Sequence, residues 1–190
     1  MTFSVLCYLC ASICGITDIT AGSLRKRDVT IFGNTFFCIF MIIMGLFEVS
    51  PCREVIVNPA IVMGPFCYML IDKSVLTVKQ NIIVPLSVFL ITAGLFRFGI
   101  DGGITVFLYA MICIPAALIM KNPFFSILIV PVFSEIVVCG MELIMGGYTF
   151  LELSDDVIGA MQGVGMLTAS VIQTAKITVL KAFKRKPVRE

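Results

Sequence analysis

The sequence predicts an all-α protein, a polytopic membrane helical bundle of six to seven spans. Of its 190 residues, 59% are hydrophobic and only 14% are charged, and the mean hydropathy is +1.06. Soluble domains average roughly 45–50% apolar and about 25% charged residues. A chain of this size cannot bury that excess in one water-soluble core. We therefore expect an integral membrane protein with lipid as its main solvent.

Each expected span is an apolar stretch close to the roughly 20 residues that a helix needs to cross a bilayer. The stretches are separated by short polar or glycine-containing breaks, and neither an internal repeat nor a soluble domain is visible. We expect one helical membrane domain over residues 1–183 and a basic cytoplasmic tail over residues 184–190. The predicted spans are Thr2–Thr17, Val29–Val49, Val55–Ile71, Ile82–Phe98, Ile104–Met120, Pro123–Gly147 and Val157–Ala182.

Two of these stretches leave the number of spans open between six and seven. Val55–Ile71 is weakly apolar for a span, and it either crosses, re-enters or lies flat. Val157–Ala182 carries Gln162, Gln173 and Lys176. It therefore either faces the bundle or lies at the interface as an amphipathic helix.

Basic clusters predict the orientation, because Lys and Arg next to membrane spans are enriched on the cytoplasmic side. Arg25–Arg27 follow the first span, and five more cations lie within residues 181–189. We expect an outside N-terminus and a cytoplasmic basic tail. With seven crossings Gly99–Gly103 lies outside, opposite Asp18; if Val55–Ile71 does not cross, both positions are cytoplasmic.

Composition also narrows the chemistry. The chain has no histidine, which excludes His general bases, Ser-His-Asp and Cys-His systems, and His-containing metal motifs. The net charge of +2 indicates no nucleic-acid partner. Most of the eight cysteines lie in apolar runs, so they are expected to be small buried hydrophobes. We expect neither a metal nor a cofactor.

Ionisable groups at membrane depth are costly, so each is a candidate functional residue. Asp18 closes the first span, Asp101 lies between two apolar helices, and Glu135 and Glu142 lie on one helical face two turns apart. Structural alternatives stay open: Asp18 caps a helix or pairs with Arg25, Asp101 forms a turn, and the glutamates form polar pairs within the bundle.

Asp18 and Asp101 together suit an aspartyl mechanism. Two carboxylates about 3 Å apart in a low dielectric share one proton. The ionised carboxylate activates a water molecule, and the protonated one donates to the developing oxyanion or the leaving amine. Gly99, Gly102 and Gly103 are either loop residues or the place where a substrate strand approaches the backbone closely.

The run Asp18-Ile-Thr-Ala-Gly-Ser-Leu-Arg-Lys resembles the first aspartate motif of type IV prepilin peptidases. The run Gly99-Ile-Asp101-Gly102 resembles their second motif, Gly-x-Gly-Asp, with the last two letters exchanged. The resemblance implies a short-form membrane aspartic endopeptidase, a hydrolase that cleaves prepilin-like proteins of the type IV pilus kind at the cytoplasmic face. It also implies a bacterial plasma membrane location, membrane lipid as surroundings and a prepilin-like protein substrate.

Two alternatives accompany this hypothesis. One is a small carrier or substrate-capture membrane subunit, in which Arg97, Glu135, Glu142 and Gln173 line a pocket at the midplane. The other is a non-catalytic membrane protein derived from a peptidase, which the exchanged glycine and aspartate favour.

Overall fold

The computed structural model describes residues 38–52, 54–71, 102–120, 123–146, 151–153 and 155–184, and the isolated positions 6, 7, 9, 10, 13, 36, 86, 90 and 94. Predictions for Asp18, Gly99 and Asp101 lie outside the described residues, as do most of the predicted spans Thr2–Thr17 and Ile82–Phe98.

Three helices are long and apolar enough to cross a membrane. They are α5 (Gly102–Ile119), α6 (Phe124–Ile144) and α7 (Ala160–Lys184). At about 1.5 Å per residue they are roughly 27, 32 and 38 Å long, compared with a hydrocarbon core of about 30 Å. The three C-terminal predicted spans are thus confirmed as helices, and the chain has the character of a membrane protein.

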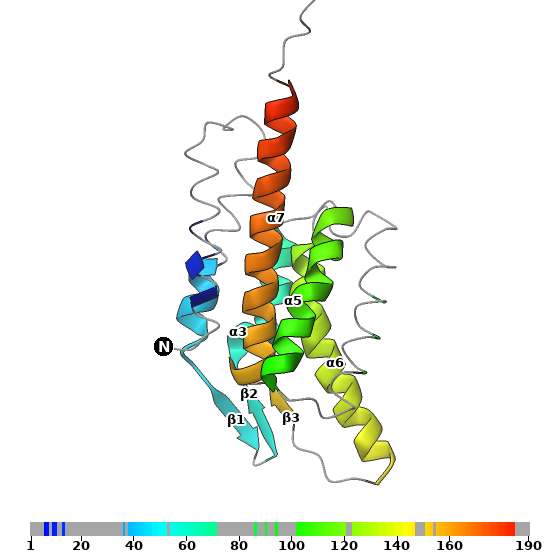
Figure 1. The fold of residues 1–190 in the computed structure, drawn as a ribbon. Helices are drawn as coiled ribbons and strands as arrows, with labels where there is room; N and C mark the ends of the chain where they lie inside the picture. Colours follow the sequence, from blue (N-terminus) through cyan, green and yellow to red (C-terminus); the bar gives the residue numbers. More distant parts are fainter. Residues whose placement is uncertain are drawn as a thin grey trace, which may run out of the picture.

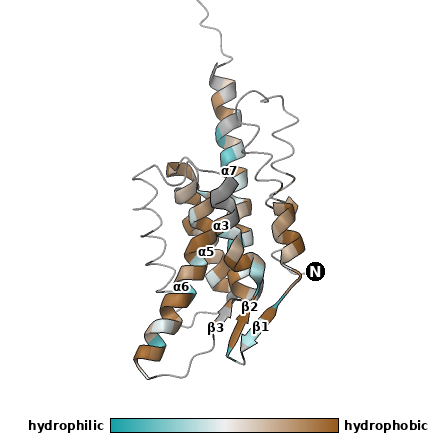
Figure 2. Ribbon diagram, turned by 180° about the vertical axis from the view of Figure 1, so that it is seen from behind, coloured by the Kyte–Doolittle hydropathy of each residue, from teal (hydrophilic) through white to brown (hydrophobic). Residues whose placement is uncertain are grey.

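The long helices pack side by side, with α5 and α7 parallel and α6 antiparallel to both (Figure 1). Gly102 at the start of α5 faces Val157 just before α7. At the other end of α5, Ala117 meets Gln173 and Lys176 of α7. Apolar residues cover most of α5 and α6, while α7 has mixed polar and apolar positions (Figure 2). The last predicted span therefore packs against the bundle.

A small sheet corrects the expectation of a purely helical chain. Strands β1 (Val49–Cys52), β2 (Val55–Val57) and β3 (Leu151–Leu153) form it in the order β1-β2-β3. β1 and β2 are antiparallel, whereas β2 and β3 are parallel and pair Val55 with Leu151. The β-branched residues of β2 favour a strand. Hydropathy alone did not separate them from the helix that follows.

That following helix, α3 (Pro59–Ile71), has 13 residues, or about 20 Å. The predicted span Val55–Ile71 is thus a strand followed by a helix shorter than the hydrocarbon core. Asn58 causes the change, because its Oδ1 accepts a hydrogen bond from the Ala60 N–H at 3.0 Å, which caps the helix. Pro59 at the first helical position has no N–H to leave unsatisfied.

Asn58 also ties three segments together at this end of the molecule. It is fully buried, and its Nδ2 donates to the Gly45 carbonyl oxygen at 3.0 Å. Its backbone N–H donates to the Leu153 carbonyl oxygen at 2.9 Å. Helical residues 38–44, strand β3 and helix α3 therefore meet here, at what we call the sheet end.

The core lies between α5, α6 and α7, with residues 38–41 and α3 packed against it. Its largest fully buried side chains include Tyr109, Leu128, Met161 and Met166. Cys38 and Cys113 belong to the same core as free thiols. These cysteines are buried hydrophobes, as the sequence predicted. A short π-helix, η2 (Asp155–Gly159), leads from β3 into α7.

Candidate functional site

The structure places two residues of the predicted substrate-approach loop on a helix. Gly102 and Gly103 form the first turn of α5. A Cβ on Gly102 would lie 3.0 Å from Val157 Cγ2. The close approach observed at this glycine is therefore to a neighbouring element of the same chain. Their predicted partners Asp18, Gly99 and Asp101 lie outside the described residues.

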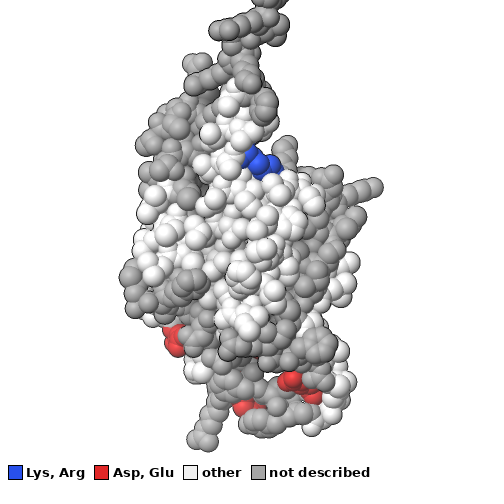
Figure 3. All heavy atoms as spheres, in the orientation of Figure 1, with Lys and Arg blue, Asp and Glu red and all other residues white. Residues whose placement is uncertain are grey.

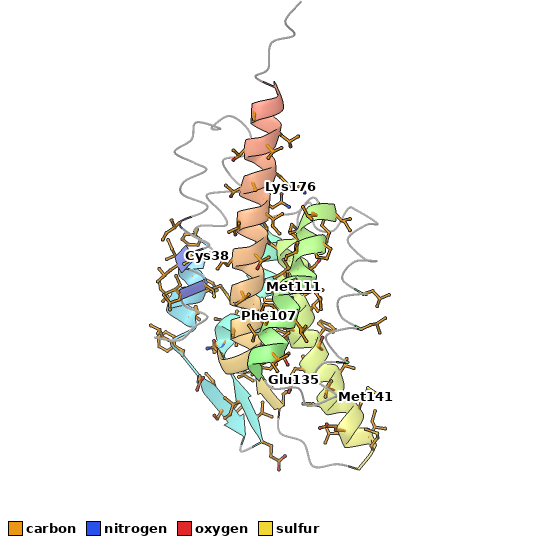
Figure 4. The ribbon with its side chains drawn as sticks, in the orientation of Figure 1. Cys38, Phe107, Met111, Glu135, Met141 and Lys176 are labelled. Atoms are coloured by element: carbon orange, nitrogen blue, oxygen red, sulfur yellow. The ribbon has the colours of Figure 1, made fainter. Side chains whose placement is uncertain are left out.

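Glu135 and Glu142 both lie on α6, so their seven-residue spacing places them on one face two turns apart, as predicted. Both side chains are partly buried. The Cys139 thiol, between them in sequence, donates to Glu135 Oε1 at 3.5 Å. Glu135 lies in the half of α6 toward the sheet end (Figure 4).

The most distinctive polar site lies where prolines interrupt the helices. Pro65 within α3 has no N–H, so it cannot donate to the carbonyl oxygen of Ile61, four residues earlier. Gln162 of α7 supplies the missing donor, because its Nε2 lies 3.1 Å from that oxygen. The two residues are 101 positions apart in sequence.

Pro131 within α6 creates a second case. It leaves the Ile127 carbonyl oxygen without its helical donor. The hydroxyl of Tyr109 on α5 donates to that oxygen at 2.7 Å, and Tyr109 is fully buried. In lipid every backbone polar group needs an internal partner. Side chains on α5 and α7 thus provide the donors that two proline-containing helices lack.

Gln162 makes one further bond and leaves one group without a partner. Its Nε2 also donates to the Leu128 carbonyl oxygen at 2.7 Å, so one amide connects α3, α6 and α7. Its Oε1 is buried and has no hydrogen-bond partner among the described residues. A buried acceptor of this kind costs about 1–3 kcal/mol.

A second polar contact closes the C-terminal end of α5. Gln173 Nε2 lies 3.0 Å from the Ala117 carbonyl oxygen, and Lys176 Nζ lies 3.2 Å from the same oxygen and 3.0 Å from that of Leu118. Lys176 points from α7 to this end of α5 (Figure 4). The last carbonyls of a helix lack helical donors and carry partial negative charge. A cation here both hydrogen-bonds and complements that charge.

We expect Lys176→Met to destabilise the protein by about 0.5–2 kcal/mol, because α5 then loses a cation at its negative end. Lys176→Arg keeps the charge and should retain most of the stability. Thermal unfolding of the purified protein in a mild detergent measures both variants. Equal losses for Met and Arg would show that charge at this position is not what stabilises α5.

The charged side chains separate along the long axis of the molecule. The described carboxylates belong to Glu48, Glu54, Glu135 and Glu142, which lie next to the sheet or in the sheet-end half of α6. Lys176 is the one Lys or Arg whose side chain is described, and it lies near the opposite end (Figures 3 and 4). We call this opposite end, where α5 ends and α6 begins, the basic end.

Sequence reasoning noted Gln162, Gln173 and Lys176 as polar residues of one segment, but it did not identify their partners. It missed Asn58 and Tyr109. The one local signal was proline inside an apolar stretch, which marks a carbonyl four residues earlier as lacking its donor. Nothing local indicates which distant side chain supplies that donor.

Comparison of the chain with protein-family models, with curated proteins and with solved structures gives no match.

Proposed function

We propose that this chain is a bacterial plasma-membrane protein of six to seven spans that acts as an aspartic endopeptidase on prepilin-like leader peptides. The observation that supports the proposal is the pair of sequence motifs around Asp18 and Asp101. Each aspartate lies at the end of an apolar stretch, where water reaches a carboxylate more readily than at the midplane. Asp101 directly precedes α5.

In this proposal one aspartate is ionised and removes a proton from water, which attacks the peptide carbonyl carbon. The other aspartate is protonated and donates to the oxyanion or to the leaving amine. Without histidine, carboxylates are the natural acid–base pair of this chain. Both aspartates must lie at the same membrane face.

The described helices make that requirement demanding. The carbonyl oxygen of Gly45, near the end of the predicted span Val29–Val49, lies at the sheet end beside Asn58. Gly102, at the start of α5, lies at the sheet end as well. A full crossing by residues 29–49 therefore places Arg25–Arg27 and Asp18 at the basic end, away from Asp101. The peptidase requires that this segment does not fully cross.

A second candidate, a carrier or substrate-capture membrane subunit, fits the full crossing. It needs no aspartate pair, and seven crossings place Arg25–Arg27 and the basic tail on one cytoplasmic face. The observation that favours it is the Gln162 Oε1 acceptor, which is buried among three helices with no partner in the described part of the chain. Transporters often hold substrates where helices are interrupted. Gln173, by contrast, has its amide nitrogen engaged at the end of α5.

Leader cleavage in cells distinguishes the two candidates. We expect Asp18→Asn and Asp101→Asn each to abolish processing of a co-expressed prepilin-like precursor, because each removes one proton-transfer group. Glu142→Gln is the matched control, since it neutralises a carboxylate outside the proposed dyad. Undiminished processing in either aspartate variant would refute the peptidase.

Cysteine labelling gives an independent topology readout. Cysteines placed next to Asp18 and Asp101, in a variant lacking the native cysteines, should react with a membrane-impermeant reagent from the same side of the membrane. Labelling from opposite sides would exclude the dyad and support the second candidate.

A further inference from the structure

The last turns of α7 extend beyond the helices that surround its first half. Lys176 reaches the carbonyls of Ala117 and Leu118, which belong to the final turn of α5. From Lys176, α7 continues for eight more residues to Lys184, or about 12 Å. Figure 1 shows this part of α7 projecting past the end of α5.

Charge in this part of the chain is entirely positive. Between Val157 and Arg189 the sequence contains no aspartate or glutamate. Lys181 and Lys184 lie in the projecting part of α7, and Arg185, Lys186 and Arg189 follow it in sequence. The carboxylates that the structure describes belong to the other end of the molecule. No nearby acidic residue in the sequence therefore neutralises these cations.

The projecting turns also carry apolar side chains. Val179 and Leu180 are more than half exposed. If α5 ends where the hydrocarbon core ends, the next several ångströms along α7 lie in the lipid headgroup layer. Apolar side chains at that depth contact acyl chains, while lysine stems extend to bring their ammonium groups to the phosphates.

We propose that the basic segment Lys181–Arg189, presented by the end of α7, binds anionic phospholipid headgroups of the cytoplasmic leaflet. The helix fixes the depth of its first cations, and the cluster of five matches the density of juxtamembrane sites that bind anionic lipid. Lys176 is not part of this site, because it is engaged by the carbonyls of α5. The inference is independent of whether the protein cleaves peptides or captures a solute.

Lipid retention by the full chain tests the proposal. The protein is purified in neutral detergent, titrated with phosphatidylglycerol or phosphatidylcholine, and examined by native mass spectrometry for bound lipid. Removing one cation near an anionic surface lowers binding about fivefold. We therefore expect Lys181→Gln with Lys184→Gln to weaken phosphatidylglycerol binding about 25-fold and to leave phosphatidylcholine binding unchanged.

Two matched variants complete the design. Lys181→Arg with Lys184→Arg keeps both charges and should bind phosphatidylglycerol as the natural protein does. Glu48→Gln with Glu54→Gln changes charge at the sheet end and should have no effect. Raising the salt concentration from 0.1 to 0.5 M should weaken phosphatidylglycerol binding, because added ions screen exposed charges. Equal affinity for the two lipids, or unchanged phosphatidylglycerol binding in the glutamine variant, would overturn the proposal.

Discussion

Replacing Gln162 by leucine should destabilise the protein by about 1–3 kcal/mol, and the loss should shrink when Pro65 is replaced by alanine. Leucine is close to glutamine in size but donates no hydrogen bond, so the Ile61 carbonyl oxygen loses the donor that it needs because of Pro65. In the Pro65→Ala background the backbone N–H of residue 65 can donate to that oxygen instead. We expect a coupling energy of about 1 kcal/mol between the two sites.

The second proline provides a matched control for this cycle. Tyr109→Phe removes the donor to the Ile127 carbonyl oxygen, so it should couple to Pro131→Ala and be additive with Pro65→Ala. Unfolding in detergent, followed by reaction of buried Cys113 with a thiol probe, measures every variant. If Gln162→Leu costs the same with and without Pro65, the pairing of this amide with the interrupted helix contributes nothing to stability.

Replacing Gly165 by alanine should also be strongly destabilising, by about 1–3 kcal/mol. An added Cβ would clash with Ile127 Cγ2 and lie 3.1 Å from Tyr109 Cε1 and 3.3 Å from Cys113 Sγ. These atoms belong to α5 and α6, which approach α7 closely at this glycine. The side chains that would have to move belong to the packed core, so relief is costly.

Gly140 on α6 is the matched control for this substitution. A Cβ at Gly140 would have no atom within 4 Å, so Gly140→Ala should stabilise the protein by up to about 1 kcal/mol through helix propensity. The same unfolding measurement in detergent compares the two variants. Opposite signs are expected, and a stabilising Gly165→Ala would contradict the close packing of α7 against α5 and α6.

These substitutions bear on function because they act on one helix. Gln162, Gly165, Gln173 and Lys176 are all on α7, and together they hold it against α3, α5 and α6. Aspartate variants that abolish processing without changing stability would support catalysis. Loss of processing in Gln162→Leu alone would instead reflect a displaced α7.

Sequence alone determined the lipid solvent, the excluded chemistries and the three C-terminal helices. Those conclusions depend on composition and on the length of apolar stretches, which are local properties. The helices α5, α6 and α7 begin and end within a few residues of the predicted spans. Sequence also identified Asp18 and Asp101, whose pairing remains a prediction.

Only the tertiary structure decided where the polar groups of the bundle are satisfied. The sheet needed β2 to meet β3, almost a hundred residues later, and hydropathy carries no information about that pairing. Pro65 and Pro131 marked two carbonyls that lack a helical donor, but the partners Gln162 and Tyr109 come from other helices. A missing backbone donor is a local fact, whereas its replacement depends on which helices pack together.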